Sequence, residues 1–137
     1  MIKAVFLDID GTLIDGSDGP FPDDIKEIMT ARKAGHKFFL ATGRSLASLP
    51  PLLRAADWID GVVAGCGATV TLGGDMLYRS AVPRDLLPEI CKLYFNNGKW
   101  CVFEGETGVF GIGSYLLFDY GEPPVRISGA DDFSLKY

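Results

Sequence analysis

The chain has 137 residues, a length typical of one domain and sufficient to bury a hydrophobic core. Its 18 acidic and 13 basic residues give a net charge of −5, and without a basic stripe this excludes a nucleic-acid or anionic-membrane binder. No apolar run approaches the ~20 residues of a membrane span, and because Asp8 and Asp10 interrupt the first apolar stretch, we expect no signal peptide. These features indicate a globular, cytoplasmic protein.

The first predicted strand, Ala4–Leu7, is an apolar run that ends directly at Asp8. Such a run is typical of a buried strand in a parallel sheet, and open α/β sheets bind their ligands at the carboxyl edge. Asp8 and Asp10 are two residues apart, so in an extended segment both side chains point the same way and can face one reacting centre. Gly11 then allows a sharp turn, and Thr12 adds a hydroxyl group. The alternative is an ordinary acidic turn after a core strand.

Helical spacing follows over Phe21–Gly35, and a second apolar run, Phe38–Ala41, leads into Thr42, Gly43 and Arg44. Strand, helix and strand in this order predict a βαβ unit, whose right-handed crossover brings both strand ends to one edge of the sheet. A hydroxyl, an open backbone N–H and a guanidinium would form an anion cradle beside the first acidic motif. Taken alone, the second motif could also be a plain strand-to-helix turn.

The remaining elements are predicted in outline. The patterns indicate a helix over Leu46–Ala56 whose regular part starts at Pro50-Pro51, a strand over Asp60–Ala64, a hairpin of Ala68–Leu72 and Met76–Ser80, a helix over Val82–Asn97, strands over Trp100–Glu104 and Val109–Ile112, and a loop at Gly121–Pro124. For the long helix, the predicted apolar face consists of Leu86, Leu87, Ile90, Leu93 and Tyr94.

Three cysteines, Cys66, Cys91 and Cys101, show no Cys-x-x-Cys spacing. An odd number without a metal-binding pattern predicts free, buried thiols in a reducing compartment. Cys66 could instead be a nucleophile, but the only histidine of the chain, His36, is expected at the surface in a helix-to-strand turn.

The two motifs resemble those of the haloacid dehalogenase-like (HAD) superfamily of phosphohydrolases, specifically its Cof-like branch. The matching residues are Asp8-Ile9-Asp10-Gly11-Thr12-Leu13 and Ala41-Thr42-Gly43-Arg44, and the resemblance continues to about Glu104. It implies an α/β fold: a Rossmannoid three-layer core with a parallel sheet, incomplete here, over residues 1–80. The start of an α/β cap domain over residues 81–137 would follow.

The resemblance also implies the chemistry. Asp8 would be the nucleophile that forms an aspartyl-phosphate, and Asp10 the general acid and base. Mg²⁺ would be held by the Asp8 carboxylate and the Asp10 main-chain carbonyl, offsetting the repulsion between carboxylates and phosphate. Thr42, with Gly43 and Arg44, would bind the phosphoryl group of a small phosphorylated metabolite.

The chain departs from the family pattern in several places. The third-motif lysine and the fourth-motif Gly-Asp-x-x-x-Asp cluster, which normally follow the cap, are absent, and Lys99 and Lys136 lie in cap-like sequence. Cys66-Gly67-Ala68 replaces the usual Asn-Gly-Ala, and the glycine-rich segment Ile14–Pro20 could be a flap or an ordinary loop. The chain is therefore expected to be an N-terminal part with little activity of its own. We expect it either to form a homo-oligomer through its incomplete sheet or cap, or to pair with another chain that supplies the absent strands.

Two other functions fit the same residues. The first is a catalytically silent, short chain of this fold that binds phosphate or a protein partner. The second is a sugar phosphomutase, because phosphomutases share the first motif and the cap type, and it would transfer phosphate rather than release it.

Overall fold

The computed structural model describes residues 1–16, 19–112 and 125–126, and the chain divides into two compact units, Met1–Ser80 and Ala81–Tyr137. The predicted loop at Gly121–Pro124, Lys136 and two residues of the glycine-rich loop lie outside the described residues. Within the described part of the chain, no helix is both long and apolar enough to cross a membrane.

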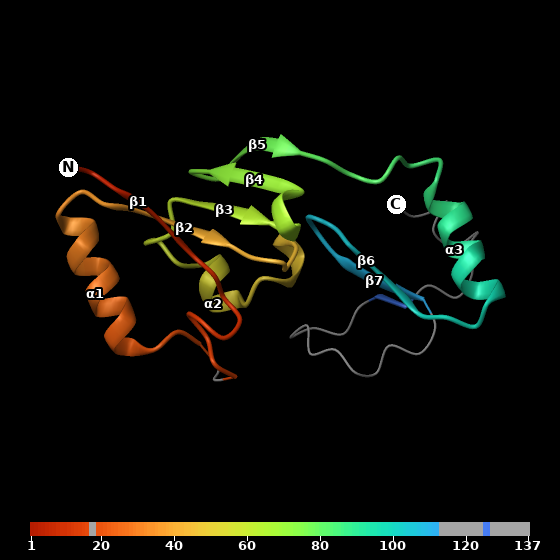
Figure 1. Ribbon diagram of the computed structural model, residues 1–137, viewed down its shortest axis with the longest axis horizontal. Helices are drawn as coiled ribbons and strands as arrows, with labels where there is room; N and C mark the ends of the chain where they lie inside the picture. The colour runs from red at the N-terminus through yellow and green to blue at the C-terminus, as the bar shows by residue number, and fades with distance from the viewer. Residues whose placement is uncertain (17–18, 113–124, 127–137) are drawn as a thin grey trace. The chain divides into compact units, whose positions relative to one another are not determined.

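The first unit contains a five-stranded sheet in the order β1-β2-β3-β4-β5 (Figure 1). The strands are β1 (Ala4–Leu7), β2 (Lys37–Ala41), β3 (Gly61–Ala64), β4 (Thr69–Leu72) and β5 (Asp75–Arg79). The first three strands are parallel, whereas β4 and β5 form an antiparallel hairpin beside β3. The predicted α/β fold with a parallel sheet is confirmed, and the predicted hairpin extends that sheet.

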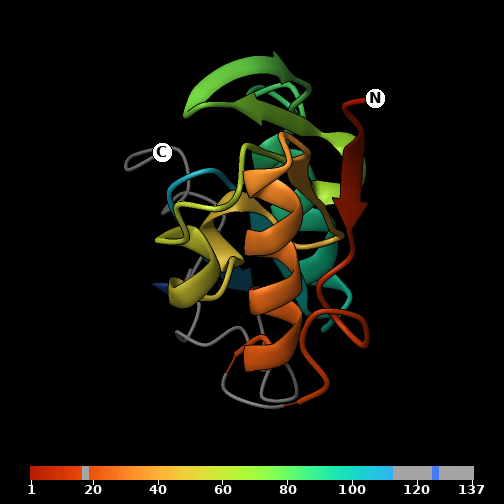
Figure 2. The same ribbon diagram turned by 90° about the vertical axis from the view of Figure 1, so that its left-hand side faces the viewer.

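Helix α1 (Pro22–Lys33) joins β1 to β2 and confirms the predicted βαβ unit (Figure 2). Pro22 suits the first helical position because its missing N–H would have no partner there. Acidic residues occupy the first turn and basic residues the last, which complements the helix dipole. Gly35, with φ +91°, then takes the left-handed conformation that ends the helix.

The helix predicted over Leu46–Ala56 is divided into two short pieces. A 3₁₀ turn, η1 (Leu46–Ser48), precedes a single α-helical turn, α2 (Pro51–Arg54). Pro50 has ψ 136° because a residue that precedes proline is pushed out of the helical region, so the two turns cannot join. A second 3₁₀ turn, η2 (Gly65–Gly67), follows β3.

One face of the sheet carries the core of this unit. Ile28 of α1 and Leu53 of α2 belong to the same buried cluster as Phe38 and Leu40 of β2, so both helices pack on one face. On β1, Phe6 is 58% exposed and stacks on Phe39 of the neighbouring strand with ring centroids 5.0 Å apart. The described residues of this unit thus supply two of the three expected layers, a sheet and a helical layer.

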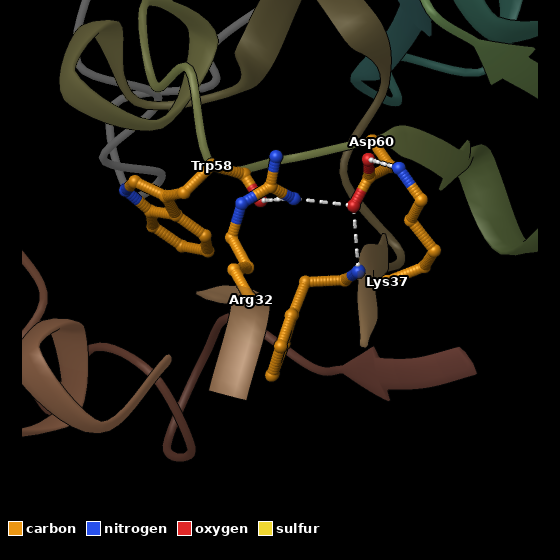
Figure 3. A network of polar contacts seen from close by, with 5 residues as sticks. Arg32, Lys37, Trp58 and Asp60 are labelled. Atoms are coloured by element: carbon orange, nitrogen blue, oxygen red, sulfur yellow. Dashed lines mark hydrogen bonds and ion pairs between the residues drawn. The ribbon is translucent and has the colours of Figure 1, made fainter. Parts of the chain in front are cut away.

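The amino-terminal edge of the sheet is held by Asp60 (Figure 3). Its carboxylate accepts hydrogen bonds from the Lys37 ammonium at 3.0 Å, from the Phe38 N–H at 2.8 Å and from Arg32. Arg32 also donates to the Trp58 carbonyl at 2.7 Å. Desolvation raises the Asp60 pKa, but the hydrogen bonds from Phe38, Lys37 and Arg32 outweigh it and hold the pKa below its usual value. The network ties α1, β2 and β3 together.

The second unit contains α3 (Leu87–Asn96), β6 (Cys101–Glu104), β7 (Val109–Ile112) and β8 (Val125–Arg126). Its sheet has the order β6-β7-β8, with β6 and β7 antiparallel and β7 and β8 parallel. The two predicted strands are confirmed as β6 and β7. Cys91 and Ile112 form its buried centre.

The helix predicted from Val82 begins at Leu87 because Pro83 starts a turn instead, closed by the Leu86 N–H on the Pro83 carbonyl at 3.0 Å. The predicted apolar face was partly wrong, since Leu93 is 62% exposed. The face of α3 that packs into the core is centred on buried Cys91. Leu87, one helical turn before it, and Phe95, one turn after it, are partly buried on the same face.

Candidate active site

Both predicted motifs follow strands that end at the same edge of the sheet. Strands β1 and β2 are parallel, with Leu7 opposite Leu40. Asp8 follows the first strand directly and Thr42 follows the second, so the two loops leave the sheet side by side. The prediction that the motifs meet at the carboxyl edge is confirmed by the contact between Asp10 and Arg44 described below.

In the loop after β1, buried and exposed side chains alternate along the chain. Ile9 is fully buried in the hydrophobic cluster, whereas Asp8 and Asp10 on either side of it are exposed. The loop is held by its own backbone, because the Ile9 carbonyl accepts hydrogen bonds from the Leu13 N–H at 3.0 Å and the Ile14 N–H at 2.9 Å. Two carboxylates are thereby presented to solvent on an anchored turn.

Gly11 makes that turn possible. Its φ of +77° lies in the left-handed region that side chains rarely adopt, and its N–H donates to the Ile14 carbonyl at 2.7 Å. A residue with a Cβ would be strained here whatever the surrounding space, so the backbone conformation of this turn favours glycine at position 11.

Asp10 and Arg44 form a bidentate ion pair. The Arg44 Nε donates to Oδ2 of Asp10 at 2.9 Å, and Nη2 donates to Oδ1 at 2.7 Å. The side chain of Asp10 is 57% exposed and that of Arg44 25% exposed. The hydrogen bond from Arg44, helped by its charge, outweighs partial desolvation and holds the pKa of Asp10 below its usual value.

Thr42 is buried and offers its hydroxyl group in a defined orientation. Its Oγ1 accepts a hydrogen bond from the Arg44 N–H at 3.1 Å, and its own N–H donates to the Val63 carbonyl at 3.0 Å. Because Oγ1 already accepts a hydrogen bond, its proton is directed elsewhere and can be donated to a ligand. Gly43, the next residue, is exposed.

Cys66 lies against the same turn. Its N–H donates to the Thr42 carbonyl at 3.2 Å, and its Sγ is 3.6 Å from the position that a Cβ at Gly43 would take. It is exposed, so the expectation of a buried thiol was wrong for Cys66, whereas Cys91 is buried and Cys101 is half-buried. Cys66 also has φ +54°, a conformation uncommon for a residue other than glycine.

Two buried serines next to Arg44, which form hydrogen bonds with each other, were not predicted from the sequence. Ser45 and Ser48 are both buried, and their hydroxyl oxygens are 3.0 Å apart. Ser45 also accepts a hydrogen bond from the Ser48 N–H at 3.3 Å, a capping contact. A serine followed three residues later by another, directly after the second motif, was the signal that could have indicated it.

The oxygen donors at this edge are of the type that Mg²⁺ takes. Asp8 supplies a carboxylate, and the Asp10 main-chain carbonyl receives no hydrogen bond from the described residues. Within the described ranges, no group of three His, Cys, Asp or Glu residues could hold a metal ion. These two residues alone would therefore leave most ligand positions to water and phosphate oxygens.

A family model described as haloacid dehalogenase-like hydrolase matches residues 5–124. The chain belongs to this family. The resemblance predicted from the two motifs is therefore confirmed, and the match covers the carboxyl edge of the sheet and most of the second unit.

Several solved structures are similar over nearly the whole chain. The sugar phosphatase BT4131 of HAD subclass IIB matches 96% of this chain and 54% of its own, with 27% identity and a TM-score of 0.78. A protein from a study of a trigonal-bipyramidal intermediate in a phosphoryl-transfer superfamily matches 99% of this chain and 56% of its own, with 27% identity and a TM-score of 0.79. A HAD/Cof-like hydrolase from Plasmodium vivax shares the fold, with 21% identity and a TM-score of 0.73.

Among curated proteins, YkrA of Bacillus subtilis (strain 168), provisionally named a phosphatase, is 29% identical over 91 residues. That alignment covers 66% of this chain and 35% of YkrA. The chain thus spans about a third of this curated relative and about half of the first two solved structures above.

Proposed function

We propose that this HAD-family chain belongs to a Mg²⁺-dependent phosphohydrolase that acts on a small phosphorylated metabolite. The observation that carries the proposal is the meeting of two motifs at one sheet edge, where the Asp8–Asp10 turn contacts the Thr42–Arg44 turn through the Asp10–Arg44 pair. Carboxylates for covalent and acid–base chemistry then lie beside donors for a phosphoryl group.

In the first half-reaction, a carboxylate oxygen of Asp8 would attack phosphorus. A new O–P bond forms while the bond from phosphorus to the leaving alcohol breaks, and Asp10 would give that alcohol its proton. In the second half-reaction, Asp10 would take a proton from water as the water oxygen attacks phosphorus, which releases orthophosphate and restores Asp8. Splitting one slow hydrolysis into two easier steps is the advantage of covalent catalysis.

Thr42 and Gly43 would bind the phosphoryl group, through a hydroxyl that can donate and an exposed backbone turn. Arg44 was also expected to bind phosphate, but its guanidinium contacts Asp10. The Asp8 carboxylate and the Asp10 carbonyl would hold Mg²⁺. When bound, the ion would neutralise charge between the carboxylates and the phosphate dianion.

The two units support a division of labour. Met1–Ser80 would form part of the catalytic core, and Ala81–Tyr137 part of an α/β cap that selects the substrate. Three cysteines without a disulfide among the described residues fit a reducing, cytoplasmic location. Phe6 is exposed on β1, which is an edge strand of the sheet formed by the described residues, and this supports self-association of the chain as given.

The test is release of orthophosphate from p-nitrophenyl phosphate by the full-length product of the gene, measured with Mg²⁺ and with EDTA. We expect Mg²⁺-dependent release and an acid-labile phosphate on Asp8 after rapid quenching. No release in either condition would contradict the proposal and favour the silent alternative. Transfer of phosphate to a sugar without net release would indicate the phosphomutase instead.

A further inference from the structure

The side chain of Arg44 is oriented by contacts on opposite sides. Its Nε and Nη2 donate to the two carboxylate oxygens of Asp10 at 2.9 and 2.7 Å, while Nη1 donates to the Ser48 carbonyl at 3.2 Å. A bidentate guanidinium–carboxylate pair fixes the plane of the carboxylate as well as its distance. Asp10 therefore has a defined orientation in the absence of any ligand.

The orientation of Arg44 in turn depends on the buried serines. Ser48 is 2% exposed, and its N–H and hydroxyl group are hydrogen-bonded to Ser45. The chain of contacts thus runs from a buried anchor at Ser45 and Ser48, through Arg44, to Asp10 on the exposed loop. No other side chain in the described part of the protein is bonded to the Asp10 carboxylate.

We infer that Arg44 is a positioning residue for Asp10, and that its guanidinium contributes to phosphoryl transfer through Asp10 rather than by contact with the phosphoryl group. The Nε–Nη2 edge of the guanidinium, which could otherwise bind two phosphate oxygens, is occupied by Asp10. This inference rests on the proposed function and changes the role that the second motif suggested for Arg44.

Positioning is needed because Asp10 is 57% exposed and has several rotamers open to it without a partner. An acid–base group must lie within hydrogen-bond reach of the proton that it moves, and small misplacement can cost about 100-fold in rate. Removal of the Arg44 guanidinium should therefore lower kcat and leave KM nearly unchanged. If Arg44 instead bound the phosphoryl group, removal of its guanidinium would raise KM.

The first test is a kinetic double-mutant cycle in the full-length gene product with p-nitrophenyl phosphate and Mg²⁺. Arg44→Gln should lower kcat about 10- to 100-fold with KM within twofold of wild type. In an Asp10→Asn background the same substitution should change kcat less than threefold, because the group it positions has lost its function. Equal effects in both backgrounds would overturn the inference.

Arg54→Gln is the matched control. Arg54 lies ten residues further along and donates to the Ala47 and Leu49 carbonyls at 2.6 and 3.1 Å, without a contact to Asp10. Its removal should leave kcat and KM within twofold of wild type. Loss of kcat in Arg54→Gln equal to that in Arg44→Gln would show a general effect on the loop and would overturn the inference.

The second test needs no turnover. Cys66 is exposed beside Gly43, so inorganic phosphate bound at the Thr42 turn should slow its alkylation by iodoacetamide, followed by peptide mass spectrometry. Thr42→Val should raise the half-protecting phosphate concentration at least tenfold, whereas Arg44→Gln should change it less than twofold. A shift in Arg44→Gln as large as in Thr42→Val would overturn the inference. Absence of protection in the wild type would instead overturn the proposed function.

Discussion

The first unit contains an aspartate–arginine pair at each end of its sheet, and the two pairs differ in their surroundings. At the amino-terminal edge, Asp60 is 13% exposed and is bound by Arg32, Lys37 and a backbone N–H (Figure 3). At the carboxyl edge, Asp10 is 57% exposed and is bound, among the residues that the structure describes, by the Arg44 side chain alone.

The difference shows how the surroundings assign a role to the same pair of residues. Asp60 joins three elements and satisfies a strand N–H, so a ligand that displaced the Phe38 N–H would leave a part-buried backbone donor without its hydrogen bond. Asp10 keeps more than half of its side-chain surface open to water or substrate beside its Arg44 contact, and an exposed pair of this kind contributes little to stability. The contacts of Asp60 stabilise the amino-terminal edge of the sheet, whereas the Asp10 carboxylate at the carboxyl edge is accessible to a ligand.

Asp8→Asn tests the chemical side of this comparison most severely. An amide is neither a nucleophile for phosphorus nor a good metal ligand, so turnover by the full-length gene product should be lost, with thermal stability retained. Phosphate release at the wild-type rate by Asp8→Asn would refute the assignment of the nucleophile.

Asp10→Asn should have the next largest effect. Loss of a general acid–base group should slow turnover about 10²- to 10⁴-fold. Its urea midpoint should fall little, because the exposed ion pair that it breaks is worth less than about 1 kcal/mol. If Asp10→Asn lost as much stability as the Asp60 variants, the proposed difference between the two edges of the sheet would be wrong.

Asp60→Ala should have the opposite profile. Loss of the carboxylate leaves Arg32, Lys37 and the Phe38 N–H without their acceptor and should cost about 2–3 kcal/mol in the free energy of unfolding. Urea denaturation of the chain measures this loss. Asp57→Ala, the control at an exposed acid three residues earlier, should stay within about 0.5 kcal/mol of wild type.

The pH dependence of stability sharpens the same contrast. The pKa of Asp60 is lower in the folded state than in the unfolded chain, so its stabilisation is present above the unfolded pKa of about 4 and is lost as pH falls through the folded pKa. The stability gap between wild type and Asp60→Asn should therefore narrow between pH 7 and pH 3. Urea midpoints that keep a constant gap across this range would contradict the proposed energetic role of Asp60.

Much of the first unit was predictable because its signals are local. Apolar runs that end in Asp8 and Thr42, with a periodic helix between them, define a βαβ unit whatever the rest of the chain does. The meeting of the two motifs followed from strand direction alone. Proline positions account for both helix boundaries: the predicted regular start at Pro50-Pro51 is confirmed by α2, whereas the turn that begins at Pro83 delays the helix predicted from Val82 until Leu87.

The partners of individual side chains were less predictable. Arg44 was expected to bind phosphate, and only the path of the chain shows that Asp10 lies within its reach. The network around Asp60 was not predicted, because its hydrogen-bond partners are 22 to 28 residues away in sequence. Which acid meets which base depends on register and loop geometry, which periodicity does not encode.

The short sequence span of the Asp60 network also has a consequence for folding kinetics. Its hydrogen bonds close loops of 22 to 28 residues, for which the entropic cost rises only slowly with length. We therefore expect these contacts to form in the transition state, so that Asp60→Asn slows refolding more than it speeds unfolding. The paired strands would then order from this edge, and the loops that carry Asp8 and Thr42 would become fixed last.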